Sequence, residues 1–238
     1  MSGTTSGTMI DLRDVRFRWR PGDDPVIDIA GLTVAAGEKL FIKGPSGGGK
    51  TTLLNLLGGV ARPEAGRIAI AGTEITALAG ARRDAFRADH IGFVFQMFNL
   101  IPYLSPVDNV VLPCHFSAAR AAAAAARSGS PAAEARRLLG QMELDADALG
   151  PGPAAELSTG QQQRVAVARS LIGAPALVIA DEPTSALDHD TRAAFMDLLF
   201  REVAAAGATL LFVSHAAGRE AGFDRTLALT DINRSAAA

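Results

Sequence analysis

Apolar and polar residues alternate at the beginning of the chain, over residues 10–15 and again over residues 26–34. A period of two is typical of strands that bury one face, and the stretch RPGDDP between the two segments is typical of a turn. Short segments with apolar centres at residues 39–43, 66–72 and 90–95 predict three further strands, and a leucine-rich helical pattern over residues 51–57 follows the first of them. The chain is therefore expected to begin with an antiparallel β lobe that leads into an α/β core.

The pattern changes near residue 97 and changes back near residue 157. Helical segments broken by proline and glycine fill the interval, which predicts a helical lobe inserted into the α/β core. Its alanine run over residues 121–126 is expected to be an exposed helix without chemistry of its own. After the interval, helices and strands alternate at residues 161–172, 177–180, 191–206, 209–213 and 226–229. Such alternation favours a mostly parallel sheet covered by helices on both faces.

The length of 238 residues suits one domain rather than two. The domain is expected over residues 9–230, with residues 1–8 as a disordered tail and residues 231–238 as a second tail. Within it, residues 9–96 and 160–230 are expected to form the α/β core with its β lobe, and residues 97–159 the helical lobe.

Composition narrows the range of partners. The formal net charge of -2 argues against a nucleic-acid surface, so the arginine clusters are expected to be solvated faces: Arg13, Arg16, Arg18 and Arg20 along a strand-like segment, and Arg82, Arg83 and Arg87 along a helical one. Cys114 is the single cysteine, which excludes an intrachain disulfide and a cysteine-rich metal site. Neither a secretory signal nor an apolar run of about 18 residues is present, so we expect a chain that is soluble by itself, in a reducing compartment.

The stretch GPSGGGKT at residues 44–51 matches the phosphate-binding pattern G-x-x-x-x-G-K-[ST], between a predicted strand and a predicted helix as that pattern requires. Backbone N–H groups of such a loop turn toward phosphate, and the helix N-terminus adds a positive dipole. Lys50 is expected to reach the β- and γ-phosphates, and the Thr51 hydroxyl to bind Mg²⁺. The residues predicted to hold the nucleotide here are Gly44, Pro45, Ser46, Gly47, Gly48, Gly49, Lys50, Thr51 and Thr52. A plain glycine turn is the alternative.

Two carboxylates follow the strand predicted at residues 177–180, in the stretch ALVIADEP. Asp181 and Glu182 should therefore emerge at the carboxyl end of a strand, where open α/β sheets bind ligands. Asp181 suits the metal, directly or through water, and Glu182 is the candidate general base that polarises the attacking water. The alternative is an acidic pair that caps a helix.

Between these motifs, the stretch LSTGQ opens the helix predicted at residues 161–172 and provides a second helix N-terminus suited to an anion. Its expected donors are the Ser158 hydroxyl and the Gly160 N–H. The phosphate loop and the carboxylates alone specify a P-loop NTPase, which could be a kinase, a GTPase or a motor. A second anion site in one chain makes sense if it completes the nucleotide site of a partner chain.

Taken in order, these motifs resemble the ATP-binding subunits of ABC transporters. The order is Lys50, Gln96, LSTGQ, ADEP, SALD at residues 185–188, and His215, and the resemblance extends over residues 10–229. It implies a P-loop NTPase core with a mostly parallel sheet, an N-terminal antiparallel β lobe and an inserted helical lobe. It also implies that ATP binding pairs two chains head to tail, as a homodimer that encloses two ATP molecules with Mg²⁺. Carried onto this sequence, the residues that would bind the partner's ATP are Ser158, Thr159, Gly160 and Gln161.

The resemblance assigns roles to three further residues. Gln96 lies where the family has a glutamine that senses Mg²⁺ and the water, and His215 where it has a histidine that contacts the γ-phosphate. Trp19 lies where an aromatic ring stacks on adenine, a contact worth roughly 1–3 kcal/mol. A structural histidine and a tryptophan packed on the sheet are the alternatives. Three histidines match nothing in the family and receive no role: His90, His115 and His189.

Residues 87–113 carry a finer resemblance, to the branch that contains lipoprotein-release and macrolide-exporter ATPases. It implies a separate permease with four membrane helices and a large extracytoplasmic domain, and a cytoplasmic location on the inner face of the cell membrane, reached only through that permease. An ATPase that regulates an extracytoplasmic enzyme or adaptor without moving a substrate is an alternative. A DNA-repair or translation ATPase is disfavoured, because the chain has neither a long coiled-coil insertion nor a second ATPase cassette.

Two residues depart from the family pattern. Thr159 replaces the first of two glycines and adds a Cβ beside the partner's phosphate, and Lys43 directly before the loop could add positive potential or point away. Next to Gln96 lies a candidate docking surface for the permease, made of Met97, Phe98, Leu100, Ile101, Tyr103 and Leu104. The alternative is that these side chains form the core of the helical lobe.

Overall fold

The computed structural model of the chain describes residues 7–184, 189–215 and 220–237. The chain consists of two compact units, which we call the first unit (residues 1–87 and 209–238) and the second unit (residues 88–208). Both combine helices with strands, so the predicted α/β class is confirmed. The expected helical lobe, residues 97–159, falls inside the second unit.

The first unit contains an antiparallel sheet with the strand order β2-β1-β4-β5. β1 (Thr8–Phe17) pairs with β2 (Ile27–Ala35) and with β4 (Ala65–Ile70), and β4 pairs with the short β5 (Thr73–Glu74). Leu12 lies opposite Leu32 on one side and Ile68 on the other, and all three are buried. The alternation in the sequence thus corresponds to one buried face of the predicted β lobe.

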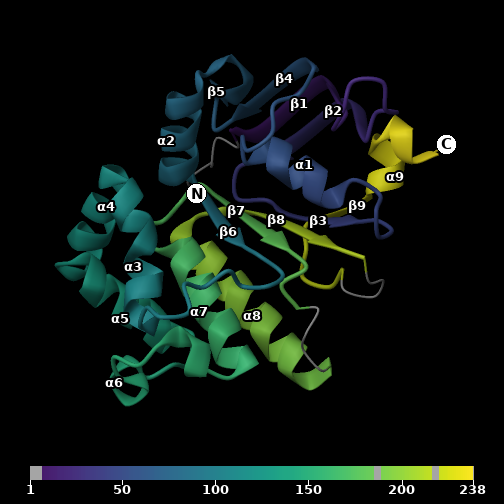
Figure 1. The fold of residues 1–238 in the computed structure, drawn as a ribbon. Coiled ribbons are helices and arrows are strands. Elements are labelled where there is room, and N and C mark those ends of the chain that lie inside the picture. The colour runs from purple at the N-terminus through teal and green to yellow at the C-terminus, as the bar shows by residue number, and fades with distance from the viewer. Residues whose placement is uncertain (1–6, 185–188, 216–219, 238) are drawn as a thin grey trace, which may run out of the picture. The chain divides into compact units, whose positions relative to one another are not determined.

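Parallel strands belong to the same unit. β3 (Lys39–Lys43) lies between β8 (Thr209–Ser214) and β9 (Arg225–Ala228), and all three run in the same direction. The apolar residues Leu40, Phe41 and Ile42 of β3 have no exposed surface, as expected for a strand covered on both faces. The loop of residues 44–49 joins β3 to α1 (Lys50–Leu57), labelled in Figure 1.

Arginines of α2 (Gly80–His90), which follows η1 (Ile75–Ala77), correct one expectation. Arg83 Nε donates to the Gly59 carbonyl oxygen at 2.8 Å, and Arg87 donates to the Gly58 carbonyl oxygen at 3.3 Å. These carbonyls lie just beyond the end of α1, where basic side chains commonly stabilise a helix. The helical cluster is therefore only in part the solvated face that the sequence predicts: Arg82 is exposed, whereas Arg83 and Arg87 are half-buried.

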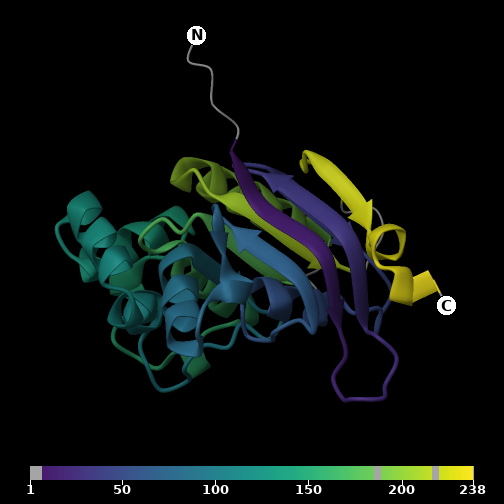
Figure 2. The ribbon, with the colours of Figure 1, turned by 90° about the horizontal axis from the view of Figure 1, so that it is seen from above.

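The end of the chain differs from the tail predicted for residues 231–238. α9 (Leu229–Ile232) and η3 (Arg234–Ala237) follow β9, and Figure 2 shows the C-terminal helix beside the β1–β2 hairpin. Asn233, between them, is 1% exposed and forms an isolated antiparallel bridge with Ile29 of β2. The segment packs because an asparagine pairs with the edge of a strand, and hydrophobic periodicity carries no signal for such a contact.

In the second unit, β6 (Ile91–Val94) pairs in parallel with β7 (Leu177–Asp181), and α7 (Thr159–Leu171) packs against β6. Three helices form a group labelled in Figure 1: α3 (Pro106–Phe116), α4 (Ala118–Ser128) and α5 (Pro131–Gln141). Each begins after a serine whose side chain accepts a backbone N–H, namely Ser105, Ser117 and Ser130. The unit also contains α6 (Ala146–Leu149), η2 (Ala154–Glu156) and α8 (His189–Ala206).

The alanine run lies on α4, but this helix is not simply exposed. Ala124 is 1% exposed and Arg120, which precedes the run, is 3% exposed. The Arg120 guanidinium donates to the carbonyl oxygens of Ile172 at 2.7 Å and Ser170 at 2.8 Å, and burial lowers its pKa to about 10. The expectation of an exposed helix is therefore wrong for the face of α4 that carries these two residues.

Candidate functional site

The phosphate loop of the first unit ends where α1 begins. Gly49 is the N-cap of α1 with a φ of +92°, a left-handed conformation that favours glycine, and no side chain caps this helix end. A Cβ on Gly49 would lie 3.1 Å from the Val26 carbonyl oxygen and 3.1 Å from Ile27 Cδ1. Glycine thus keeps the loop close to the start of β2, and the positive end of the α1 dipole lies at the loop.

Lys50 is 7% exposed and is held by the loop itself. Its Nζ donates to the carbonyl oxygen of Gly44 at 3.0 Å and to that of Pro45 at 2.8 Å. An ammonium group in this position can exchange a carbonyl partner for a phosphate oxygen, with which it forms a stronger, charge-assisted hydrogen bond. Of the two threonines that follow, Thr51 is exposed and Thr52 is buried, which favours Thr51 as the one that binds a metal ion.

Three further residues for which the sequence suggests a role near the nucleotide lie in the first unit. Trp19 is 58% exposed and rests edge-on against Phe17, with ring centroids 4.9 Å apart and an angle of 86° between the planes. Most of its ring is therefore accessible, as stacking on a base requires. His215 is exposed and directly follows β8. Lys43 Nζ lies 3.8 Å from the Glu220 carboxylate, so it forms an ion pair next to the loop.

The two candidate carboxylates lie at the carboxyl end of β7, as the sequence predicts. Asp181 is the last residue of the strand and is half-buried, and Glu182 is 8% exposed. Glu182 also has a φ of +46°, which is rare for a residue with a Cβ. Such a conformation costs about 1–3 kcal/mol and persists only where the surrounding structure holds it.

Gln96 is exposed and follows β6, the strand that pairs with β7. Shortly after it, Phe98 and Asn99 have φ values of +60° and +49°. Arg169 of α7 donates to both of their carbonyl oxygens, at 2.5 Å to Phe98 and 2.6 Å to Asn99. Burial lowers the pKa of Arg169 to about 10, so the guanidinium stays charged near neutral pH. Sequence reasoning missed this residue, whose only signal is an arginine within the apolar stretch VAVARSL.

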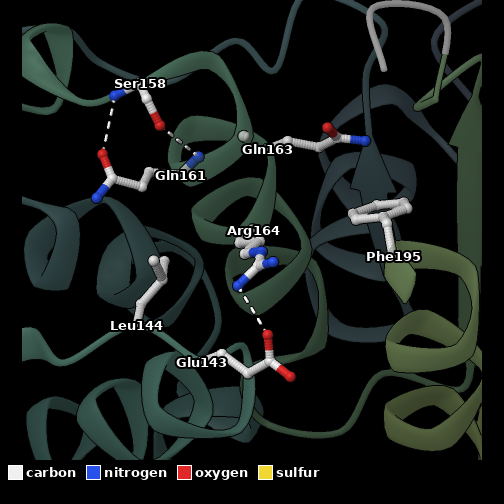
Figure 3. A pocket seen from close by; sticks show the side chains of 8 residues that line it. Glu143, Leu144, Ser158, Gln161, Gln163, Arg164 and Phe195 are labelled. Atoms are coloured by element: carbon white, nitrogen blue, oxygen red, sulfur yellow. Dashed lines mark hydrogen bonds and ion pairs between the residues drawn. The ribbon is translucent and has the colours of Figure 1, made fainter. Parts of the chain in front are cut away.

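The signature turn, LSTGQ at residues 157–161, leads into α7. Ser158 is the N-cap and forms a capping box with Gln161: its Oγ accepts from the Gln161 N–H at 3.3 Å, and its own N–H donates to Gln161 Oε1 at 2.9 Å (Figure 3). The Ser158 hydroxyl hydrogen can still be donated to a ligand. Ser158 and Thr159 are exposed. The turn is therefore closed by its own residues, with its outer face accessible.

A cavity of about 300 Å³ lies beside this turn, and Figure 3 shows its lining: Glu143, Leu144, Ser158, Gly160, Gln161, Gln163, Arg164 and Phe195. Gln163 is 1% exposed, and its Nε2 donates to the carbonyl oxygen of Pro183, the residue after Glu182. Helix α7 thus contacts the segment after Glu182 through Gln163 and the segment after Gln96 through Arg169. Neither link was expected, because the partners of both side chains are backbone carbonyls far away in the sequence.

The residues predicted to act on the nucleotide are divided between the units. Trp19, residues 44–52 and His215 belong to the first, and Gln96, residues 158–161, Asp181 and Glu182 to the second. The SALD stretch, residues 185–188, lies outside the described residues. Among the described residues no group of three or more His, Cys, Asp or Glu could hold a metal ion. Hydroxyl, amide and carboxylate oxygens nevertheless suit Mg²⁺, and Thr51, Gln96 and Asp181 carry these donors.

The predicted docking stretch is partly exposed. Met97 is 79% and Tyr103 78% exposed, whereas Phe98 is 8% exposed. Leu100, Ile101 and Leu104 are half-buried. The prediction is therefore wrong for Phe98, which belongs to the interior of the second unit. Phe116, at the end of α3, is 73% exposed and was not singled out in the sequence.

Known proteins resemble this chain over most of its length. A family model described as ABC transporter matches residues 27–185. The chain is 39% identical over 213 residues to the lipoprotein-releasing system ATP-binding protein LolD of Chromohalobacter salexigens, which covers 90% of this chain and 86% of that protein. It is 37% identical over 235 residues to the macrolide export ATP-binding/permease protein MacB of Chromobacterium violaceum, which covers 95% of this chain and 34% of that protein. The chain thus spans about a third of the macrolide-export relatives.

Solved structures with the same fold include dimers. One is the dimeric structure of a post-hydrolysis state of the ATP-binding cassette MJ0796 bound to ADP and Pi, with a TM-score of 0.78, 33% sequence identity, and coverage of 92% of this chain and 94% of that one. A second dimeric structure of MJ0796, described as a bacterial ABC transporter cassette, has a TM-score of 0.76 at 33% identity, with the same coverage.

Proposed function

Since this chain belongs to the ABC transporter family of ATPases, we propose that it is the ATP-binding and hydrolysing subunit that drives a separate membrane permease. The observation that carries the proposal is that one chain has two helix N-termini suited to phosphate, after Gly49 at α1 and after Ser158 at α7. A chain that hydrolyses ATP alone needs one. The second, where Ser158 and Thr159 are exposed, suits the triphosphate held by another copy of the chain.

In this proposal the first unit binds the nucleotide. The loop N–H groups and the α1 dipole hold the phosphates, and Lys50 exchanges the Gly44 or Pro45 carbonyl for a phosphate oxygen. Trp19 stacks on the adenine with the exposed part of its ring. Bound Mg²⁺ would neutralise charge on the β- and γ-phosphates, and the residues whose oxygens suit it are Thr51, Gln96 and Asp181.

Hydrolysis in this proposal depends on Glu182. Water attacks the γ-phosphorus, the bond to the bridging oxygen of the β-phosphate breaks, and the water proton passes to the Glu182 carboxylate. Gln96 orients the water, and His215 donates a hydrogen bond to the γ-phosphate. The buried position of Glu182 and its held backbone support this role, because a general base must be fixed relative to the water that it activates.

Two copies of the chain are proposed to pair head to tail on ATP binding. Each would then place its signature turn on the ATP in the other's phosphate loop. The exposed Ser158 and Thr159 support this arrangement, as does the likeness to a cassette whose dimer holds ADP and Pi. Thr159 can still donate its backbone N–H, so we expect the threonine to change affinity rather than to prevent binding.

The permease is proposed to dock on the second unit, next to Gln96. In the part of the chain that the structure describes, no helix combines the length and apolar character needed to cross a bilayer. Met97 and Tyr103 place two large apolar surfaces on the segment that follows Gln96, more than a short surface loop requires. Docking here would hold the chain on the inner face of the cell membrane. It would also couple the permease to the segment that senses the nucleotide.

Co-purification of the permease tests this surface. Tyr103→Glu should abolish co-purification with the membrane permease that the unmodified chain brings down and should abolish transport in reconstituted vesicles, while ATP binding by the isolated chain is unchanged. Phe116→Glu is the matched control, because Phe116 is almost equally exposed on the same unit but is distant from Gln96 in the sequence. Full permease binding by Tyr103→Glu would contradict the proposed interface. Coupled ATP hydrolysis without substrate movement in the vesicles would favour a regulator over a transporter.

A further inference from the structure

The segment after β9 pairs with the outer edge of the antiparallel sheet. β2 is the outermost strand of that sheet. The Asp28 N–H donates to Asn233 Oδ1 at 2.8 Å, and Asn233 Nδ2 donates to the Val26 carbonyl oxygen at 2.9 Å. One buried amide side chain therefore satisfies both a donor and an acceptor of the strand edge, as a neighbouring strand would. Figure 2 shows α9, the helix that leads to Asn233, beside β2.

The carbonyl that Asn233 holds also lies close to the end of the phosphate loop. A Cβ on Gly49 would lie 3.1 Å from the Val26 carbonyl oxygen and 3.1 Å from Ile27 Cδ1. The peptide between Val26 and Ile27 thus lies directly beside Gly49, the N-cap of α1. If this peptide moved, the loop would lose its support at the position where the helix begins.

The same C-terminal segment borders the beginning of the phosphate loop. Leu229, the first residue of α9, has no exposed surface, and its Cβ lies 3.2 Å from where a Cβ on Gly44 would be. Leu229 and Asn233 are joined by the backbone bond from the Asn233 N–H to the Leu229 carbonyl oxygen, at 2.8 Å. The segment from Leu229 to Asn233 therefore lies beside Gly44 directly, and it holds the Val26 carbonyl that lies beside Gly49.

Phe17 and Trp19, at the end of β1, are linked to the Val26–Ile27 peptide as well. The Val26 N–H donates to the Phe17 carbonyl oxygen at 2.8 Å, and the Phe17 and Trp19 rings form a T-shaped pair. Trp19 is the single tryptophan of the chain. Its emission can therefore report on the β1–β2 turn without a label.

We propose that Asn233 is a positioning residue for nucleotide binding, which acts by fixing the Val26–Ile27 peptide against the phosphate loop. The inference rests on the proposed function only in requiring that the loop binds ATP. A loop held in its binding conformation before the ligand arrives loses less conformational entropy on binding, so preorganisation lowers the Kd. Asn233, which the sequence predicts to lie in a tail, would thus support the nucleotide site from outside it.

Calorimetric titration of ATP into the full-length Asn233→Leu variant tests this inference. Leucine has a similar volume but neither donates nor accepts, so the Val26 carbonyl and the Asp28 N–H lose their partner. We expect the Kd for ATP to rise about tenfold, since the loss of buried hydrogen bonds is passed to the loop. Hydrolysis at saturating ATP should stay close to normal, and the anisotropy of Trp19 emission without nucleotide should fall. Asp231→Ala and Arg234→Ala are the controls, because both residues are exposed neighbours of Asn233.

The alternative is that Asn233 only anchors the chain end. In that case Asn233→Leu would lower the unfolding midpoint but leave the Kd of the folded protein and the Trp19 anisotropy unchanged, and this result would overturn the inference. If the variant does not fold, hydrogen exchange on the unmodified chain decides: ATP should slow exchange of the Asp28 amide together with the amides of residues 233–235. Protection of the phosphate loop alone would overturn it. Failure of the unmodified chain to bind ATP would instead contradict the proposed function.

Discussion

Glu182 combines a buried carboxylate with a backbone conformation that its side chain disfavours. We predict that Glu182→Gln keeps ATP binding but slows hydrolysis roughly 10²–10⁴-fold, because the amide cannot accept the proton of the attacking water. Phosphate release measured in the presence of permease checks this. Glu156→Gln is the control, since it removes an exposed carboxylate from the same unit. Near-normal turnover by Glu182→Gln would contradict the assignment of the general base.

At the residue scale, the sequence predicts the side chains that act on the nucleotide but not the side chains that hold the site's backbone. Lys50, Asp181 and Glu182 could be placed because short motifs fix their spacing to a strand end or a helix start. Gln163 and Arg169 could not, because each donates to a carbonyl that belongs to a different segment of the chain. Backbone acceptors have no sequence signature, so a buried polar residue in an apolar helix is the only hint.

Helix α7 is the element that holds two loops of the second unit. Arg169 donates to the carbonyl oxygens of Phe98 and Asn99, both in the left-handed region. We predict that Arg169→Met lowers the free energy of unfolding by about 2–4 kcal/mol, because two carbonyls lose a charged donor. Urea unfolding measures the loss. The control on the same helix is Arg164→Met. Arg164 donates to one carbonyl oxygen, that of Met142 at 3.1 Å, and pairs with Glu143, whose side chain is 68% exposed, so we expect a smaller loss of about 1 kcal/mol.

An equal loss from Arg164→Met and Arg169→Met would contradict the role given to Arg169. It would mean that substitutions anywhere on α7 destabilise the unit by the same route, for example through helix propensity. Proteolysis of the segment after Gln96 offers a second test, because the loop should be cut faster once its two carbonyls are released.

At the element scale, prediction succeeds where one face or both faces of a strand are buried. The apolar run at residues 39–43 gives the bounds of β3, Lys39–Lys43, and the alternation at residues 26–34 lies within one residue of β2. It fails for α9 and for Asn233, because four helical residues are too few to show a period. Their position is set by hydrogen bonds to β2 and by the buried Leu229 rather than by a pattern.

For the whole molecule, the α/β class could be predicted from the sequence because predicted strands and helices alternate. The family could be predicted because six motifs occur in a fixed order. The division of the chain at residues 87 and 208 could not. The first boundary falls after Arg87, inside the continuous helix α2. No glycine, proline or change of composition marks this position in the sequence. Long-range packing sets such a boundary, and periodicity reports only local burial.

The proposed head-to-tail dimer predicts complementation between two inactive chains. Lys50→Met impairs the phosphate loop and leaves the signature turn intact. Ser158→Asp does the reverse: aspartate still caps α7 by accepting the Gln161 N–H, but its charge repels the triphosphate of the partner. Each variant alone should hydrolyse little ATP. In a mixed dimer, one site combines the intact loop of one chain with the intact turn of the other.

Random pairing makes about half of the dimers mixed, and each mixed dimer has one complete site of two. If the two sites work independently, an equimolar mixture should therefore recover about a quarter of normal ATPase activity. The measurement is phosphate release as the mixing ratio is varied, with a maximum near equal amounts. Ser158→Asn is the control, because it caps the helix without adding charge and should keep activity without mixing. Activity that stays at the level of the two parent variants at every ratio would show that each chain uses its own signature turn, and the head-to-tail arrangement would then be wrong.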